Sequence, residues 1–304
     1  MRRWLSSALP IVCAIALPVT AMADRAAKPV MTWPDLLERP RPAADRRIAY
    51  GGDPLQFVEL WLPEGAGPYP VVLMLHGGCW LTDVADRTIM NWIADDLRRR
   101  GIAVWNVEYR GVDRAGGGYP GTFRDVAAAA DMLARDGAGL GLRTGRIVAI
   151  GHSAGGHLAL WLADRPALPA ASPLRGDSPA RIAVAISQGG LPDLEFSSNT
   201  VDHGCGTEGA RKMAGEPAPG RPDIYADTSP IAMTPGDAIR IQINTAEDRI
   251  APPDYAAAYR DALAAKGKEV RTITVPDEAH VELIAPDSGA WAETVPLILE
   301  ALKP

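Results

Sequence analysis

The stretch that decides the fold is RIVAIGHSAGGHLAL, residues 146–160. Its first half is an apolar, β-branched run, which is typical of a strand buried on both faces of a sheet. Residues 154–163 are rich in Ala and Leu and predict a helix. Ser153 lies at the junction, between Gly151 and Gly155, in a Gly-x-Ser-x-Gly pattern. The order strand, serine, helix therefore predicts a tight turn that holds the serine hydroxyl at the carboxyl edge of the sheet.

A Gly-x-Ser-x-Gly pattern arises by chance in about one chain in ten of this length. The strand before it and the helix after it favour the functional interpretation. A dinucleotide-binding fingerprint is excluded, because it needs Gly-x-Gly where this chain has Gly-x-Ser. The amide of Ala154 opens the predicted helix, where N–H groups lack helical partners and can hold an oxyanion.

The composition is that of an ordinary globular protein, with 22% charged and 47% hydrophobic residues in 304. The formal net charge of −6 gives no reason to expect nucleic acid as a partner. Predicted strands alternate with predicted helices over residues 55–304, which indicates one α/β domain. Such an alternation implies a mostly parallel sheet covered by helices on both faces. The sequence does not predict the oligomeric state.

Residues 1–23 have the pattern of a secretory signal peptide. Two arginines form a basic start, residues 5–20 are mostly apolar and uncharged, and residues 21–23 read Ala-Met-Ala, as at a cleavage site. We therefore expect an exported protein, periplasmic or secreted, whose mature chain starts at Asp24. A retained membrane anchor is the alternative. The apolar run is short and contains two prolines, so no stable anchor is expected.

The remaining chain divides into a lead-in, a series of strands and helices, and an insertion. Residues 24–54, rich in Pro, Arg and Ala, predict an extended lead-in. Residues 188–237 are dense in Gly and Pro and predict a partial cap over the carboxyl edge of the sheet. Further strands are expected at residues 55–62, 71–75, 102–107, 181–187, 239–244 and 270–275. Further helices are expected at residues 86–100, 122–135 (capped by Thr122), 209–215, 254–266 and 291–302.

A serine nucleophile needs a base to take its proton, and the chain has five histidines. His280 follows the last predicted strand, in a loop that opens at the same edge as Ser153, and is the expected base. The alternative is a surface histidine. The side chain of His152 is expected to point away from the serine, and His76 to order the glycine loop that it opens. His203 lies in the insertion.

The acid that orients the base is expected in the loop after the preceding strand. Residues 244–252 offer Glu247 and Asp248. The chain order serine, acid, histidine is the one known for this architecture. The spacing to Pro252 favours Asp248, which leaves Glu247 as a solvated neighbour.

The sequence His-Gly-Gly-Cys-Trp at residues 76–80 follows a predicted buried strand. Glycines there let the backbone approach a bound carbonyl, so we expect this loop to supply the second half of an oxyanion hole. A plain glycine turn is the alternative. Gly77, Trp80 and His152 flank these groups and are candidate substrate-binding residues.

With these residues, the chain resembles the α/β-hydrolase superfamily, and within it the bacterial esterases and kynurenine formamidase-like proteins with a His-Gly-Gly-x-Trp loop. The resemblance implies an α/β-hydrolase fold. It implies a catalytic triad of Ser153, Asp248 and His280. It implies an oxyanion hole made by the amides of Gly78, Cys79 and Ala154. The matching motifs lie at residues 76–80, 107–110, 116–122, 151–157, 248–252 and 280–286 and at Trp291, and so span nearly the whole mature chain.

Two positions depart from the pattern of these relatives. Asn244 and Thr245 stand where relatives often have His-Gly, so the acid loop is expected to differ in shape. Cys79 stands where many relatives have Gly, Ala or Tyr. Cys79 and Cys205 remain once Cys13 leaves with the signal, and they could form a disulfide or stay as two buried thiols. A disulfide would tie the oxyanion loop to the insertion.

The function expected from these features is hydrolysis of small-molecule carboxylic esters with short or aromatic acyl groups. An arylformamidase is the first alternative, and export of the protein argues against it. A prolyl oligopeptidase-type exopeptidase is a further alternative, but that family has a propeller domain for which this sequence has no room. A non-catalytic binding module usually lacks a triad member, whereas all three are in place. No metal-ligand spacing appears, and the chemistry needs no metal or organic cofactor.

Overall fold

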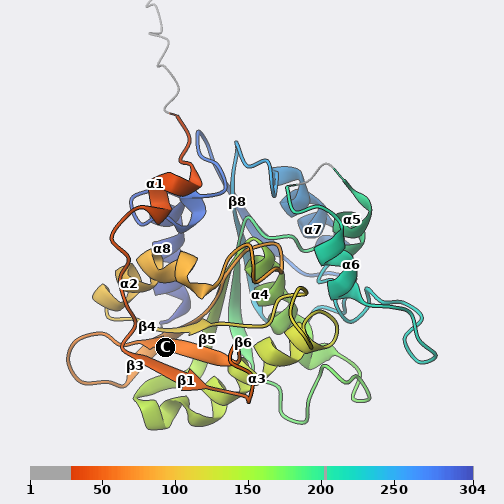
Figure 1. Cartoon of the computed structure of the whole chain (residues 1–304), viewed down its shortest axis with the longest axis horizontal. Helices are drawn as coiled ribbons and strands as arrows, with labels where there is room; N and C mark the ends of the chain where they lie inside the picture. Colours follow the sequence, from red (N-terminus) through yellow and green to blue (C-terminus); the bar gives the residue numbers. More distant parts are fainter. Residues whose placement is uncertain (1–28, 202–203, 304) are drawn as a thin grey trace, which may run out of the picture.

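The computed structural model describes residues 29–201 and 204–303, and the predicted signal peptide lies outside them. Within these residues one eight-stranded sheet forms the centre of the molecule, in the order β1-β2-β4-β3-β5-β6-β7-β8 (Figure 1). β3 to β8 are parallel, whereas β1 and β2 join one edge in antiparallel fashion. The strands are β1 (Arg46–Ala49), β2 (Phe57–Trp61), β3 (Tyr69–Leu75), β4 (Ala103–Val107), β5 (Leu142–His152), β6 (Ile182–Gln188), β7 (Ile239–Thr245) and β8 (Val270–Val275).

The central strands are buried on both faces, as their continuous apolar runs predict. In β3, Val71, Leu73 and Leu75 face one hydrophobic core, while Val72 and Met74 face the other. Successive side chains of a strand point to opposite faces, so one apolar run supplies both cores.

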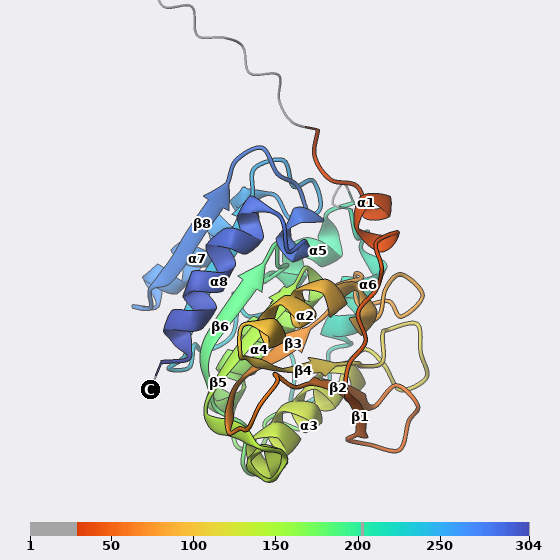
Figure 2. The ribbon, with the colours of Figure 1, turned by 90° about the vertical axis from the view of Figure 1, so that its left-hand side faces the viewer.

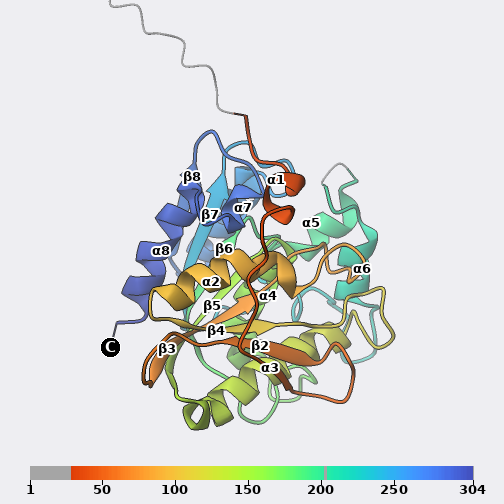
Figure 3. The ribbon, with the colours of Figure 1, turned by 60° about the vertical axis from the view of Figure 1, so that its left-hand side comes forward.

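Helices cover both faces of the sheet. One layer consists of α3 (Gly121–Asp136), α4 (Ala154–Asp164) and α7 (Pro253–Ala265). The other consists of α1 (Trp33–Leu37), α2 (Asn91–Arg99) and α8 (Gly289–Ala301). Figure 2 shows α2 and α8 in front of the sheet, and Figure 3 shows α1 at the end of the molecule toward which β8 points. No helix of the described residues combines the length and the apolar character needed to cross a membrane.

The prediction of an extended lead-in over residues 24–54 was wrong for residues 29–54, the part that the structure describes. This segment contains α1 and β1, and β1 pairs with β2, so the folded domain begins well before residue 55. The sequence conceals these elements because α1 has only five residues and β1 is mostly exposed, without an apolar alternation. Leu36 of α1 is nevertheless fully buried in the core beside α2 and α8.

The predicted cap of Thr122 was also wrong. The helix α3 begins at Gly121, after Pro120. The Thr122 hydroxyl instead donates to the Arg110 carbonyl (2.6 Å) and accepts from the Gly118 amide (2.9 Å). It therefore fixes the glycine-rich loop rather than the helix end.

The insertion between β6 and β7 contains two short helices, α5 (Leu194–Asn199) and α6 (Glu208–Ala214). α6 packs beside the loop after β3, because a Cβ added to Gly209 would lie 2.7 Å from the Cys79 carbonyl oxygen. The Lys212 carbonyl accepts the Tyr119 amide at 2.9 Å. The insertion thus lies against the loop predicted to hold the oxyanion. That it caps a bound substrate stays a prediction.

Candidate active site

Ser153 occupies a strained turn between β5 and α4. Its φ of 54° and ψ of −121° lie outside the regions that L-residues favour, at a cost of about 1–3 kcal/mol. The turn closes because Gly151 and Gly155 have no side chains: a Cβ on Gly151 would lie 2.0 Å from the Gly155 carbonyl oxygen. The Ser153 amide donates to the Gln188 carbonyl at 2.8 Å, which anchors the turn to the end of β6.

Asp248 and His280 form a direct pair at the ends of β7 and β8. His280 Nδ1 lies 2.6 Å from Asp248 Oδ2, and both side chains are buried. Asp248 Oδ1 accepts the amides of Ile250 (2.8 Å) and Ala251 (2.9 Å). Burial raises the pKa of the Asp248 carboxyl, but the hydrogen bonds from His280 and the two amides outweigh it, so the pKa lies below its usual value. Glu247, the alternative acid, is exposed.

Gly189 connects the serine turn with this pair, and the sequence analysis missed it. It follows Gln188, its amide donates to the Ile243 carbonyl (2.8 Å), and its φ is +52°. A Cβ here would lie 3.0 Å from Asp248 Oδ2 and 3.2 Å from His280 Cε1. The glycine-dense composition of the insertion was the available signal, but it does not say which glycine lies at the site.

The loop after β3 has an unusual backbone. Gly78, Cys79 and Trp80 have φ of 112°, 54° and 60°, three successive positive values. Within the described part of the chain, we find no hydrogen bond from the amides of Gly78, Cys79 or Ala154. Successive amides in such a concave arrangement, together with a helix N-terminus, suit an anion.

Three side chains contact this loop or its first residue and fix its conformation: those of His76, Glu108 and Tyr109. His76 Nε2 lies 3.1 Å from Glu108 Oε1, and its Nδ1 lies 2.7 Å from the Gly77 carbonyl oxygen. Tyr109 stacks on His76 with ring centroids 4.2 Å apart, and its hydroxyl donates to the His76 carbonyl (2.7 Å). Burial, and then the Glu108 carboxylate, raise the pKa of Tyr109 well above its usual value, so it stays a neutral donor. His76 thus orders the loop, as the sequence predicts.

Two further links tie the loop to the insertion. A disulfide joins Cys79 to Cys205, with the Cα atoms 5.3 Å apart. Trp80 Nε1 donates to His157 Nδ1 (3.2 Å), so the proton of His157 sits on Nε2, which donates to the Thr228 carbonyl (2.8 Å). Burial lowers the pKa of His157 to about 4, which keeps this ring neutral.

Two of the three candidate substrate-binding residues have buried side chains with partners inside the protein. Trp80 and His152 are each 1% exposed. Trp80 is bonded to His157, and His152 Nε2 contacts the His280 carbonyl. Ser153 and His280 are as deeply buried, at 2% and 5% exposed, so a contact of Trp80 or His152 with substrate stays a prediction. Gly77 lies against the turn itself, because a Cβ added there would be 3.0 Å from Ser153 Cβ.

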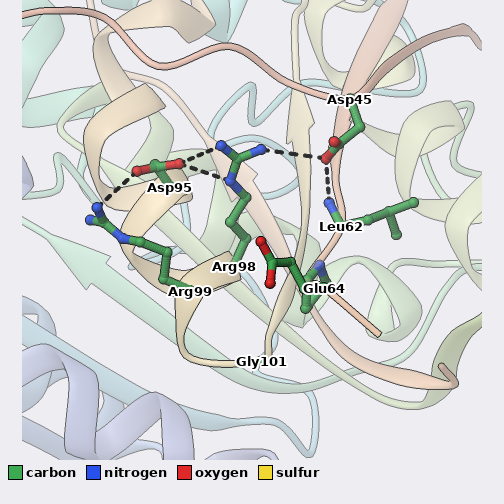
Figure 4. Close-up of a pocket in the computed structure, with 8 residues that line it drawn as sticks. Asp45, Leu62, Glu64, Asp95, Arg98, Arg99 and Gly101 are labelled. Atoms are coloured by element: carbon green, nitrogen blue, oxygen red, sulfur yellow. Dashed lines mark hydrogen bonds and ion pairs between the residues drawn. The ribbon is translucent and has the colours of Figure 1, made fainter. Parts of the chain in front are cut away.

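A pocket of about 710 Å³ lies at the end of the sheet where the parallel strands begin, away from Ser153. It is beside the end of β2 and the loop before β4 (Figure 4). Most of its charges are paired with one another: Arg98 contacts Asp95 (2.7 Å) and Asp45 (3.6 Å), and Arg99 contacts Asp95 (3.2 Å). None of the predicted site residues lines it. Among the described residues we find no cluster of three or more His, Cys, Asp or Glu that could hold a metal ion.

Comparison with known proteins gives the same architecture. A truncated carbohydrate esterase from gut microbiota superposes with a TM-score of 0.71 at 20% identity, over 86% of this chain and 97% of that one. Esterase 2 of Thermogutta terrifontis, with butyrate bound, gives 0.65 at 19% identity, over 86% and 94%. The α/β-hydrolase fold predicted from the sequence is therefore confirmed.

The curated relatives are longer proteins, and this chain covers only part of each. Esterase LipC of Mycobacterium tuberculosis is 25% identical over 244 residues, which are 77% of this chain and 59% of that protein. The chain spans between 24% and 59% of the length of the curated relatives it matches. The BD-FAE family model matches residues 58–263, which include Ser153 and Asp248. Because this match covers more than half of the chain, the protein belongs to the BD-FAE family.

Proposed function

We propose that the protein is a serine hydrolase that cleaves carboxylic esters through an acyl-enzyme formed on Ser153. The observation that carries this proposal is the buried hydrogen bond between His280 and Asp248, at the sheet edge where the strained Ser153 turn lies. A carboxylate can only accept, so Nδ1 of His280 carries the proton and Nε2 is the free base. Asp248 thereby sets the tautomer that a serine nucleophile needs.

The reaction follows from these roles. His280 Nε2 takes the hydroxyl proton of Ser153 as the oxygen attacks the substrate carbonyl carbon. The tetrahedral oxyanion lies against the amides of Gly78, Cys79 and Ala154, each worth about 3 kcal/mol of barrier. The alcohol leaves with the proton held by His280, and water then attacks the acyl-enzyme with the same base.

The proposed substrates are small esters with short or aromatic acyl groups. Support comes from similar proteins, among them Esterase LipC and the butyrate-bound esterase 2. We also propose export to the periplasm or beyond, because disulfides such as Cys79–Cys205 persist in oxidising compartments. Cell fractionation and N-terminal sequencing test this: a reduced cytoplasmic protein would contradict it, and a mature chain starting at Asp24 would support it.

The activity is tested with p-nitrophenyl esters from acetate to decanoate beside N-formylkynurenine. We expect turnover of the short esters, lost in Ser153→Ala and retained in Ser178→Ala, an exposed loop serine. Turnover of the formamide alone would replace the ester by an arylformamidase substrate while keeping the site. No turnover, with Ser153 unreactive to a fluorophosphonate, would favour a binding module.

A further inference from the structure

His152 is a buried ring that joins the two ends of the site. It precedes Ser153 in the chain, and its Nε2 lies 3.1 Å from the His280 carbonyl oxygen. The two imidazole rings pack together with centroids 4.4 Å apart and planes at 45°. One side chain thus spans the distance between the serine turn and the backbone of the loop that carries His280.

The proton of His152 has a defined place. A carbonyl oxygen can only accept, so Nε2 carries the proton and Nδ1 does not. Nδ1 is buried and has no hydrogen-bond partner among the described residues. Burial, and then the adjacent His280, hold the pKa of His152 well below its usual value. His152 therefore stays neutral and keeps its donor on the His280 carbonyl while His280 takes up a proton.

The N-terminal segment supports the same loop from outside. Trp33 of α1 meets the His152 ring edge-on, with centroids 6.2 Å apart. The buried Glu282 carboxylate accepts the amides of Met31 and of Ala279 (3.1 Å to the latter), the residue before His280. Figures 1 and 3 show α1 beside the loop that follows β8. A segment remote in sequence is therefore packed against the catalytic edge.

We propose that His152 is a positioning residue, which fixes the His280 backbone relative to Ser153, and that Trp33 of the N-terminal helix holds the His152 ring in place. The inference rests on the proposed function. Asp248 restrains His280 at a single ring nitrogen, about which the imidazole can still swing. A second restraint at the His280 carbonyl fixes the backbone from which this ring projects, and so limits that freedom. Such a restraint matters because a misplacement of about 1 Å costs on the order of 100-fold in rate.

The test compares His152→Phe, which keeps a ring and loses the donor, with His152→Gln, which keeps a donor near the Nε2 position. We expect His152→Phe to lower kcat for p-nitrophenyl acetate by about 10–100-fold with KM within about twofold. His152→Gln should recover most of this loss. A purely structural role would not produce a loss in kcat alone that a donor restores. Wild-type kcat in His152→Phe, or a change confined to KM, would overturn the proposal.

A second variant covers the case in which His152→Phe does not fold. Trp33→Leu should lower kcat by a smaller factor, also without raising KM. Trp92→Leu is the matched control, because Trp92 is buried in the same core and its Nε1 bonds the Pro40 carbonyl, away from His152. It should cost stability and leave kcat unchanged. An equal kcat loss in both tryptophan variants would overturn the role of Trp33.

Fluorophosphonate labelling separates this inference from the proposed function. If the wild type labels but hydrolyses none of the esters, the proposed substrate class fails, and the labelling rates of the variants still test positioning. Equal rates in wild type and His152→Phe would overturn it, and a rate at least about tenfold lower in the variant would support it. A wild type that neither labels nor hydrolyses overturns the proposed function and this inference with it.

Discussion

Gly189 shows how much of the site depends on a single missing side chain. Its φ of +52° is one that other residues adopt only with strain, and a Cβ would lie 2.6 Å from Leu283 Cδ1 and 3.0 Å from Asp248 Oδ2. We expect Gly189→Ala to lower the free energy of unfolding by about 1–3 kcal/mol. It should also lower kcat at least about tenfold, since Asp248 and His280 must move.

Urea unfolding and ester hydrolysis measure both effects of this change. Gly220→Ala is the control, because nothing lies within 4 Å of a Cβ at Gly220. Equal stability and activity in the two variants would show that the Asp248–His280 pair does not need the space at Gly189.

Asp248 and Glu247 allow a second comparison at the same scale. In Asp248→Asn, the side-chain oxygen still accepts the amides of Ile250 and Ala251, so the NH₂ group faces His280 Nδ1. An NH₂ group donates, which favours the wrong tautomer of His280. We expect kcat to fall by about 10³–10⁴-fold. Glu247→Gln, one residue away and exposed, should keep wild-type kcat. Steady-state kinetics at pH 8 measure both variants. A large loss of kcat in Glu247→Gln would show that Asp248 is wrongly assigned as the acid.

At the scale of elements, the loop at residues 76–80, which is proposed to hold the oxyanion, is held by the insertion as well as by the sheet. The disulfide at Cys79 and the Trp80–His157–Thr228 relay lead to different parts of the insertion. These links hold Cys79 and Trp80 at positive φ, which such residues adopt only at a cost. If this loop holds the oxyanion as proposed, the insertion acts on the reaction through the shape of the loop.

Breaking the disulfide should affect stability and rate together. We expect Cys205→Ser, which leaves Cys79 in place, to lower the free energy of unfolding by about 2–5 kcal/mol, because the bond spans 126 residues. Acylation of Ser153 should also slow. Dithiothreitol should have the same effect on the wild type and none on the variant. A wild-type acylation rate after reduction, verified by thiol titration, would mean that the relay alone shapes the loop.

At the scale of the whole molecule, the domain needs its N-terminal segment. A chain starting at Leu55 would lose α1 and β1, expose the edge of β2 and remove Leu36 from the core. We expect it to unfold at lower urea than a chain starting at residue 29, and to associate through the exposed strand. Equal unfolding midpoints would show that the sheet does not need its outermost strand.

Buried histidines make the fold sensitive to acid. The pKa of His157 is about 4 in the folded protein and about 6.5 when unfolded, so the unfolded chain binds the extra proton between these values. The contribution of His157 to the free energy of unfolding is therefore fully present above about pH 6.5. It falls by about 3 kcal/mol as the pH drops toward 4.

Unfolding by urea at pH 7 and pH 5 measures this effect. His157→Phe should be less stable than the wild type at pH 7, because it lacks both hydrogen bonds of His157. Its stability should also depend less on pH. An unchanged slope would assign the acid sensitivity to other groups, His152 first, whose pKa burial also lowers.

Local patterns predicted the fold and the main candidates for the site. The strand and helix around Ser153 are specified by adjacent residues, and parallel strands end at one edge, which brings Asp248 and His280 to it. Contacts between distant segments could not be predicted. Gly189, Trp33 and the role of His152 depend on which loops meet in space. The short, exposed β1 gives no periodic signal, so its pairing with β2 is visible only in three dimensions.

The two ends of the described chain lie at opposite edges of the sheet. Residue 29 enters beside α1, at the edge toward which the parallel strands run, whereas α8 carries the chain away toward the other edge (Figure 2). A surface or carrier attached through the carboxyl end would therefore leave the end of the sheet that carries Ser153 facing the solution. A carrier attached directly at residue 29 would instead lie against that end, so we expect the point of attachment to decide how well an immobilised preparation hydrolyses bulky esters.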